Sequence, residues 1–253
     1  MIIQLTDKCS MECIHCMFSC NNKNKNHMTE DVLNEIIQSD FFIKSKCIHI
    51  SGGEPLEHPN FFKFLDMVLE KAKQKLVTIV SNGMFTYNKH LIENLLERLN
   101  KHECLFLQIT NDPMFYPINI PEVKHGKISF SRDVHTLVAL GRAKNLGSEY
   151  YKRKHQRIAP FCFNSRLTFL KIANKDLVQT MIELESLGKS CESLFTPEGD
   201  YCPSECGRYI LGNIMDKNFL KKANFKASKN PKPCDECGVY SSMNPIIRSQ
   251  LQI

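Results

Sequence analysis

The sequence has no apolar run long enough to span a lipid bilayer, so we expect no contact with a membrane. Its first six residues contain neither a basic region nor the apolar stretch of a secretion signal. Without an export signal, the twelve cysteines argue against a disulfide framework and favour metal or redox chemistry in a reducing compartment. We therefore expect a cytoplasmic protein.

The 253 residues are enough for one large domain with a substantial core and one small domain. The formal net charge of +6 is mild. It suits an acidic substrate, but a charge of this size often serves only surface solubility. Composition alone therefore selects no substrate.

Three cysteines within eight residues are the most informative feature. Cys9, Cys13 and Cys16 follow the spacing C-x3-C-x2-C. Three thiolates on one short loop can hold three irons of a [4Fe–4S] cube and leave the fourth iron open, and an open coordination position is typical of a catalytic metal. A zinc loop or a disulfide staple is the alternative. Zinc ligands normally come in two C-x2-C-like halves, and this triplet does not divide that way.

The first part of the chain is predicted to alternate strands and helices. Apolar runs that begin about every thirty residues predict strands, and apolar stripes at helical spacing predict the helices between them. Such units form a right-handed parallel sheet, so we expect an α/β fold. The expected strands are 2–6, 47–50, 76–80, 104–110, 127–130, 136–140 and 166–172; the expected helices are 28–39 (with Thr29 as N-cap), 60–73, 91–99 and 175–187.

Polar segments follow three of these strands at their carboxyl ends. Residues 51–55 read Ser-Gly-Gly-Glu-Pro, residues 81–83 read Ser-Asn-Gly and residues 110–112 read Thr-Asn-Asp. The cysteine triplet has the same position after the first strand. Because parallel α/β folds bind ligands at the carboxyl ends of their strands, we expect these four segments to meet in one site.

The cysteine triplet and the Gly-Gly-Glu-Pro segment together resemble the radical S-adenosylmethionine enzymes. That family carries C-x3-C-x2-C after its first barrel strand and G-G-E-P after its second, and both motifs are intact and in order here. One variation is His15, where the family often has an aromatic residue before the third cysteine. The resemblance implies a partial (β/α)6 TIM-like barrel over residues 1–188.

The same resemblance implies the chemistry of the site. The three thiolates ligate three irons, and S-adenosylmethionine chelates the fourth. A low-potential donor of the flavodoxin or ferredoxin type reduces the cluster, S-adenosylmethionine is cleaved, and a 5′-deoxyadenosyl radical abstracts hydrogen from the substrate. The implied cofactor-binding residues are Gly52, Gly53 and Glu54 at the methionine amino group, the adjoining Pro55, Ser81 and Asn82 at the ribose hydroxyls, Thr110 at the end of the fourth strand, and Arg142 at the methionine carboxylate.

Residues 189–253 contain a second group of cysteines. A predicted hairpin ends at Cys202, Leu-Gly-Asn-Ile follows at residues 211–214, and Cys234 and Cys237 form a C-x2-C knuckle. This arrangement resembles the small cysteine-rich twitch or SPASM extension of radical S-adenosylmethionine enzymes, and it implies an auxiliary [4Fe–4S] cluster. The candidate ligands are Cys191, Cys202, Cys206, Cys234 and Cys237, one more than four positions need.

A structural zinc is the alternative for the second group. Cys202 and Cys206 with Cys234 and Cys237 make a four-thiolate site of acceptable spacing, and Cys191 is then a buried or free thiol. Thiolates suit both metals, so the resemblance decides in favour of the cluster. The remaining cysteines are expected in the core, with Cys162 also a candidate ligand: Cys20, Cys47, Cys104 and Cys162.

The motifs do not fix the substrate, because one fold hosts many reactions. A peptide maturase that performs a net oxidation is the first hypothesis, although a barrel that begins at residue 2 leaves no room for a leader-binding domain. Oxidation or epimerisation of a sugar-like small molecule is the second. RNA modification has only the basic aromatic segment 150–157 and the lysines of 221–232 in its favour, and we expect no nucleic-acid partner. An iron–sulfur protein that binds a partner or senses redox state is the non-catalytic alternative.

Overall fold

The computed structural model describes residues 1–110, 112–116, 118–131, 141–147, 150, 192–202, 210–216 and 218. The chain divides into two compact units. The first comprises Met1–Cys13, Cys20–Val134 and Phe195–Gly199, and the second comprises Ile14–Ser19, His135–Leu194 and Asp200–Ile253. The expected domain boundary at residue 188 lies outside the described residues, as do the strands expected at 136–140 and 166–172 and the helix expected at 175–187.

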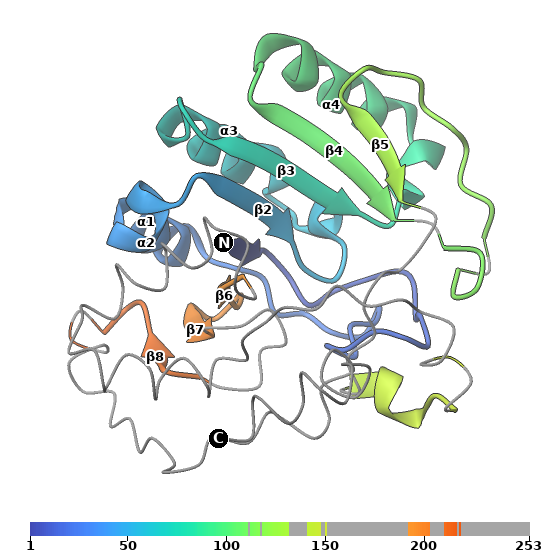
Figure 1. Cartoon of the computed structure of the whole chain (residues 1–253), viewed down its shortest axis with the longest axis horizontal. Helices are drawn as coiled ribbons and strands as arrows, with labels where there is room; N and C mark the ends of the chain where they lie inside the picture. Colours follow the sequence, from blue (N-terminus) through green and yellow to red (C-terminus); the bar gives the residue numbers. More distant parts are fainter. Residues whose placement is uncertain are drawn as a thin grey trace, which may run out of the picture. The chain divides into compact units, whose positions relative to one another are not determined.

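A parallel sheet forms the centre of the first unit. In the order β5-β4-β3-β2-β1 each strand pairs in parallel with its neighbour, and the sheet is open (Figure 1). This arrangement confirms the expected α/β fold with a parallel sheet. The strands are β1 (Ile2–Gln4), β2 (Cys47–Ser51), β3 (Leu76–Ser81), β4 (Leu105–Thr110) and β5 (Ile128–Ser131).

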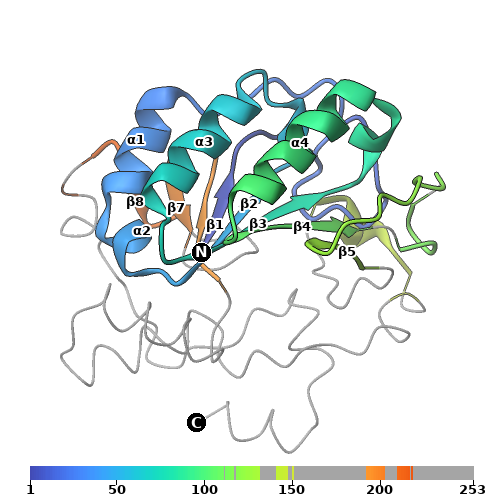
Figure 2. The same cartoon turned by 90° about the horizontal axis from the view of Figure 1, so that it is seen from above.

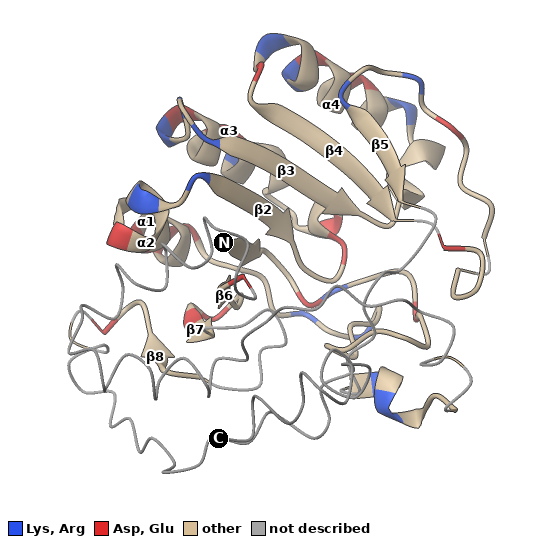
Figure 3. Cartoon of the chain, viewed as in Figure 1, with Lys and Arg blue, Asp and Glu red and all other residues tan. Residues whose placement is uncertain are grey.

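These five strands contain no Lys, Arg, Asp or Glu. Figure 3 shows the charged residues of this unit on its helices and loops instead. Paired positions such as Ile3 with Ile50, and Ile79 with Leu107, bring apolar side chains to the same face of the sheet. The uncharged strands therefore form one wall of the core.

Helices cover one face of this sheet (Figure 2). They follow successive strands, as repeated βαβ units of one handedness require. Two short 3₁₀ helices lie directly after β2 and β3. The helices are α1 (Glu30–Gln38), α2 (Asp40–Lys44), α3 (Phe61–Lys71) and α4 (Lys89–Lys101), with the 3₁₀ helices η1 (Pro55–Glu57) and η2 (Met84–Tyr87).

The start of α1 confirms the predicted cap, and a second helix that was not predicted follows its end. The Thr29 hydroxyl accepts the Val32 N–H at 3.4 Å. At the other end, the Ser39 hydroxyl accepts the Phe42 N–H at 3.3 Å, so Ser39 ends α1 and begins α2. The sequence pattern did not predict α2. Ser39 both ends α1 and begins α2, so no loop separates the two helices in the sequence.

The core lies between the helices and the sheet. Leu33 and Ile36 of α1 and Leu65 and Val68 of α3 are all fully buried. Burial of each such side chain stabilises the fold by about 1.5–3 kcal/mol. The strands contribute Ile48, Ile50, Val77, Ile79, Leu105, Leu107 and Ile109.

In the second unit the structure describes a 3₁₀ helix, η3 (Gly141–Asn145), and two strands, β7 (Asp200–Cys202) and β8 (Gly212–Asn213). The two strands pair antiparallel, and Asn213 Nδ2 donates to Asp200 Oδ1 at 2.8 Å. The Leu-Gly-Asn-Ile segment thus forms a strand beside the one that ends at Cys202. A further strand, β6 (Leu194–Phe195), spans the division between the units. Across the described ranges, every helix is too short or too polar to cross a membrane.

Candidate functional site

The cysteine loop begins where β1 ends. Backbone bonds hold its start: Cys9 N–H donates to Asn21 O at 3.0 Å, and Asp7 N–H donates to Asn26 O at 3.1 Å. Cys9 is 6% exposed, and Cys13 is half-buried. The loop therefore leaves the sheet in a fixed direction, with its first thiol already enclosed.

The two glycines after β2 pack directly against this loop. Gly53 N–H donates to Thr6 O at 2.6 Å, and Glu54 N–H donates to Lys8 O at 2.8 Å. A Cβ on Gly53 would lie 2.2 Å from Lys8 O, and a Cβ on Gly52 would lie 2.5 Å from Thr6 O. Within the first unit, the motif needs glycine because backbone approaches backbone there.

Glu57 fixes the loop from the same segment, and sequence reasoning missed it. Its Oε1 accepts the Ser10 N–H at 2.7 Å, although the two residues are 47 positions apart. Glu57 ends η1, which begins at Pro55. The available signal was a second carboxylate three residues after Glu54, on the 3₁₀ turn that Pro55 begins.

The Glu54 carboxylate is the centre of a buried hydrogen-bond network. It is 1% exposed and accepts three donors: the Leu56 N–H at 3.2 Å, the Ser81 hydroxyl at 3.0 and 3.1 Å, and the Asn82 N–H at 2.7 Å. Burial raises the pKa of Glu54 to about 7, against these hydrogen bonds, which favour the ionised form. The carboxyl ends of β2 and β3 are joined through this one side chain.

Asn82 extends the network to the cysteine loop. Its Nδ2 donates to Cys9 Sγ at 3.6 Å, and its Oδ1 accepts the Met84 N–H at 2.8 Å. Burial raises the pKa of the Cys9 thiol to about 12, and the hydrogen bonds from the Met11 backbone and from Asn82 oppose that rise. Cys9 therefore requires either a metal or further donors to exist as a thiolate.

Thr110 lies at the end of β4 beside a tyrosine that the sequence patterns did not single out. The Thr110 hydroxyl donates to Ser81 O at 3.2 Å and contacts the Tyr116 hydroxyl at 3.0 Å. Burial, with smaller contributions from Cys13, Cys9 and Glu54, holds the pKa of Tyr116 well above its usual value. Tyr116 therefore stays protonated and can donate its hydroxyl hydrogen to Thr110.

In the second unit, η3 packs on the last part of the cysteine loop. Arg142 N–H donates to Cys16 O at 3.0 Å. Gly141 has φ +53°, and a Cβ there would lie 2.4 Å from Met17 O. Sequence reasoning placed Arg142 after a strand at 136–140, which lies outside the described residues; the backbone contact to Cys16 is an additional finding.

Among the tail cysteines, the described residues include Cys202. Cys202 ends β7 and is fully buried. Cys191, Cys206, Cys234 and Cys237 lie outside the described residues, as does Cys162.

The donor chemistry of the first three cysteines fits an iron–sulfur cluster. Among the described residues no three His, Cys, Asp or Glu side chains converge closely enough to hold one metal ion. A cubane cluster takes one thiolate per iron, so its ligands need not converge on a single point. The Cys9 sulfur accepts an N–H from Asn82, and such a bond orients and stabilises a metal-bound thiolate.

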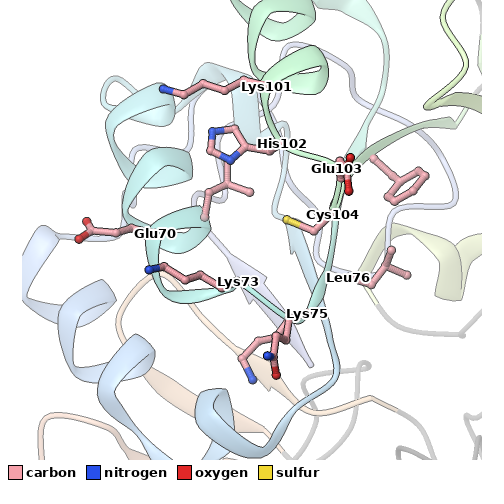
Figure 4. A pocket seen from close by; sticks show the side chains of 11 residues that line it. Glu70, Lys73, Lys75, Leu76, Lys101, His102, Glu103 and Cys104 are labelled. Atoms are coloured by element: carbon pink, nitrogen blue, oxygen red, sulfur yellow. The ribbon is translucent and has the colours of Figure 1, made fainter.

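A hollow of about 670 Å³ lies at the other ends of the strands, by the starts of β3 and β4 (Figure 4). Its lining mixes the bases Lys73 and Lys101 with the acids Glu70 and Glu103. A third lysine, Lys75, already donates to Ile43 O at 2.7 Å and Ser45 O at 2.8 Å. This hollow contains none of the residues of the candidate site.

Comparisons with known proteins agree with this geometry. Residues 3–113 match the profile of the Radical SAM superfamily. The chain is 28% identical over 118 residues to the putative peptide biosynthesis protein YydG of Bacillus subtilis (strain 168), an alignment that covers 46% of this chain and 36% of that protein. It is 29% identical over 105 residues to GTP 3′,8-cyclase of Alkaliphilus oremlandii (strain OhILAs), covering 40% of this chain and 33% of that protein.

The fold is shared with a solved structure, the crystal structure of BtrN in complex with AdoMet and 2-DOIA. The TM-score is 0.52 at 14% sequence identity, over 99% of this chain and 85% of that one. The chain spans about a third of the length of the curated relatives it matches.

Proposed function

Because residues 3–113 match the profile of the Radical SAM superfamily, we propose that this enzyme holds a [4Fe–4S] cluster at Cys9, Cys13 and Cys16 and reductively cleaves S-adenosylmethionine. The superfamily implies both cofactors. When bound, they supply one-electron cleavage of S-adenosylmethionine and abstraction of hydrogen from a substrate. The chain's own residues provide binding, orientation and exclusion of water.

The observation that carries the proposal is the connection from Glu54 through Asn82 to Cys9. Glu54 belongs to the Gly-Gly-Glu-Pro motif and Cys9 to the cysteine triplet, and Asn82 bonds to both, at 2.7 Å and 3.6 Å. Motifs from three separate strand ends therefore meet in one buried network. A cofactor-binding role requires that meeting, whereas three unrelated turns would not produce it.

The contacts to S-adenosylmethionine belong to the same proposal. The Glu54 carboxyl has a pKa of about 7, so it can accept a bond from an ammonium group in its ionised form. The Arg142 guanidinium can pair with a carboxylate through two parallel N–H bonds. The proposed set is Gly52, Gly53, Glu54 and Pro55 for the methionine amino group, Ser81 for the ribose with Asn82 and Thr110 beside it, and Arg142 for the carboxylate.

We also propose a peptide substrate and a net oxidation. The relative named a peptide biosynthesis protein supports this choice. The match to GTP 3′,8-cyclase supports the alternative, a small-molecule substrate. A low-potential donor of the flavodoxin or ferredoxin type is the electron source that such chemistry requires.

For the tail, the proposal is an auxiliary [4Fe–4S] cluster of the twitch or SPASM type. Its candidate ligands are Cys191, Cys202, Cys206, Cys234 and Cys237. Structural zinc remains the alternative, since the same thiolates suit either metal.

The deciding experiment is anaerobic reconstitution of the full chain with iron and sulfide, followed by addition of dithionite and S-adenosylmethionine. We expect 5′-deoxyadenosine and methionine to form, and we expect Cys13→Ala to abolish them. Cys104→Ala is the matched control, because Cys104 lies by the start of β4 in the hollow described above, away from the site. A fully loaded wild-type protein that forms no 5′-deoxyadenosine would make a partner-binding or redox-sensing iron–sulfur protein the better account.

A further inference from the structure

The side-chain amide of Asn82 faces the sulfur of Cys9. The Nδ2 to Sγ distance is 3.6 Å, and the two residues are 73 positions apart in sequence. Asn82 is 7% exposed and Cys9 is 6% exposed. Because so little of either residue is exposed, this contact is enclosed by protein.

The orientation of the amide follows from its other bonds. Oδ1 accepts the Met84 N–H at 2.8 Å, and a backbone N–H can only donate. The oxygen must therefore face Met84, which leaves the NH2 group facing Cys9. The backbone of Asn82 is fixed as well, because its N–H donates to Glu54 Oε2 at 2.7 Å.

The turn after Asn82 is also determined by its surroundings. Gly83 has φ +83°, and its N–H donates to the Ser81 hydroxyl at 3.0 Å. A Cβ at Gly83 would lie 2.7 Å from the side chain of Ile120. The Ser-Asn-Gly segment thus has little freedom to turn the amide elsewhere.

The Asn82 amide therefore points an N–H group at the Cys9 sulfur. A cluster becomes more negative on reduction, and N–H donors at its thiolates favour the more negative state. Hydrogen bonds to a metal ligand also fix its orientation. In an enclosed site water does not replace a lost donor.

We propose that Asn82 is a positioning residue for the Cys9 thiolate, and that its N–H···S bond raises the reduction potential of the cluster. This inference rests on the proposed function, since it requires the cluster to assemble at Cys9. It differs from the expectation that the Asn82 side chain binds the ribose, because both ends of the amide are already bonded within the protein.

Two variants distinguish the loss of the N–H···S bond from the effect of an added negative charge. Asn82→Leu removes the donor without adding charge. Asn82→Asp keeps the oxygen for Met84 N–H, removes the donor and adds a negative charge. The control is Asn60→Asp, the same exchange at the exposed N-cap residue of α3, where the side chain makes no capping bond.

The measurement is a redox titration of the reconstituted cluster by electron paramagnetic resonance, without S-adenosylmethionine. At the wild-type midpoint, the ratio of reduced to oxidised cluster should fall about tenfold in Asn82→Leu, which corresponds to about 59 mV for one electron. The ratio should fall further in Asn82→Asp, and in Asn60→Asp it should equal that of the wild type.

Each outcome decides the question. An unchanged midpoint potential in Asn82→Leu with full iron content overturns the proposal. If that variant then binds S-adenosylmethionine more weakly, Asn82 has the ribose role instead. If a variant binds no iron, alkylation of Cys9 relative to Cys13 in the metal-free chain replaces the titration: slower alkylation of Cys9 supports the bond, and an unchanged ratio overturns it. Failure of the wild type to bind iron would refute the proposed function itself.

Discussion

The carboxylate of Glu54 accepts the backbone N–H of Asn82 at 2.7 Å, across 28 positions of sequence. This bond ties the end of β2 to the end of β3. The other donors to Glu54 are equally specific, since the Leu56 N–H bonds to Oε1 and the Ser81 hydroxyl lies within 3.1 Å of both carboxylate oxygens. Such a carboxylate organises the site around itself even before a cofactor binds.

The first prediction concerns the pH dependence of stability. Burial raises the pKa of Glu54 to about 7, well above that of an unfolded glutamate. Between pH 4.5 and 7 the folded chain therefore holds a proton that the unfolded chain has released, so the free energy of unfolding should fall as pH rises through this window. A shift of this size corresponds to on the order of 3 kcal/mol.

Urea unfolding at a series of pH values from 5 to 8 measures this fall. Glutamine does not titrate, so in Glu54→Gln the free energy of unfolding should decrease less between pH 5 and 8 than in the wild type. Glu70→Gln, at an exposed position of α3, should behave as the wild type. Equal pH slopes for wild type and Glu54→Gln would contradict the prediction.

The second prediction concerns the glycine motif. In Gly53→Ala the new methyl group would lie 2.2 Å from Lys8 O, a backbone atom that cannot rotate away. We expect a loss of about 1–3 kcal/mol in the free energy of unfolding and a lower iron content, because the start of the cysteine loop must shift. Urea unfolding and iron analysis measure the two effects.

Gly126→Ala is the matched control for this substitution. A Cβ at Gly126 has no atom within 4 Å, so stability and iron content should stay at wild-type values. If both glycine variants behave alike, close backbone approach is not the reason for the motif.

The third prediction concerns Arg142. Its backbone N–H bonds to Cys16 O, so Arg142→Lys should keep that contact and the iron content. A lysine lacks the planar fork that pairs with a carboxylate, so S-adenosylmethionine should bind about tenfold to a hundredfold more weakly, on the order of 1–3 kcal/mol. Isothermal titration calorimetry under anaerobic conditions gives the dissociation constant.

Arg98→Lys tests whether the loss of any paired arginine has the same effect. Arg98 makes two bonds of 2.8 Å to Asp66 on the helical face of the first unit. The affinity for S-adenosylmethionine should not change in this variant. If the affinity is unchanged in Arg142→Lys as well, the Arg142 side chain does not bind S-adenosylmethionine, and the residue contributes only its backbone contact to Cys16.

Sequence periodicity predicted the frame of the first unit well. The strands at 47–50, 76–80, 104–110 and 127–130 and the cap at Thr29 follow from local patterns, and the structure confirms them within one or two residues. The first strand is shorter than expected, because β1 ends at Gln4 and the next residues turn to another segment: Thr6 pairs with His27, and Asp7 N–H donates to Asn26 O.

The site network could not be predicted in the same way. Glu54, Ser81 and Asn82 were selected because they follow strands, but their mutual bonds span 27 and 28 positions and depend on the sheet register. Glu57 and Tyr116 carry no motif of their own and gain their roles only through tertiary contacts. Local patterns identify the residues of such a site more readily than their partners.

The last prediction concerns the metal content of the tail. If the tail cysteines hold a second [4Fe–4S] cluster, the reconstituted chain should contain about eight irons and no zinc. Replacing Cys234 and Cys237 by alanine should remove about half of the iron, while 5′-deoxyadenosine still forms, because the first three cysteines are untouched. Cys20→Ala, a buried cysteine of the first unit, should keep the full iron content. Iron near four per chain with one zinc would establish the four-thiolate zinc site instead. The proposed net oxidation would then need another electron acceptor, since zinc has no redox chemistry.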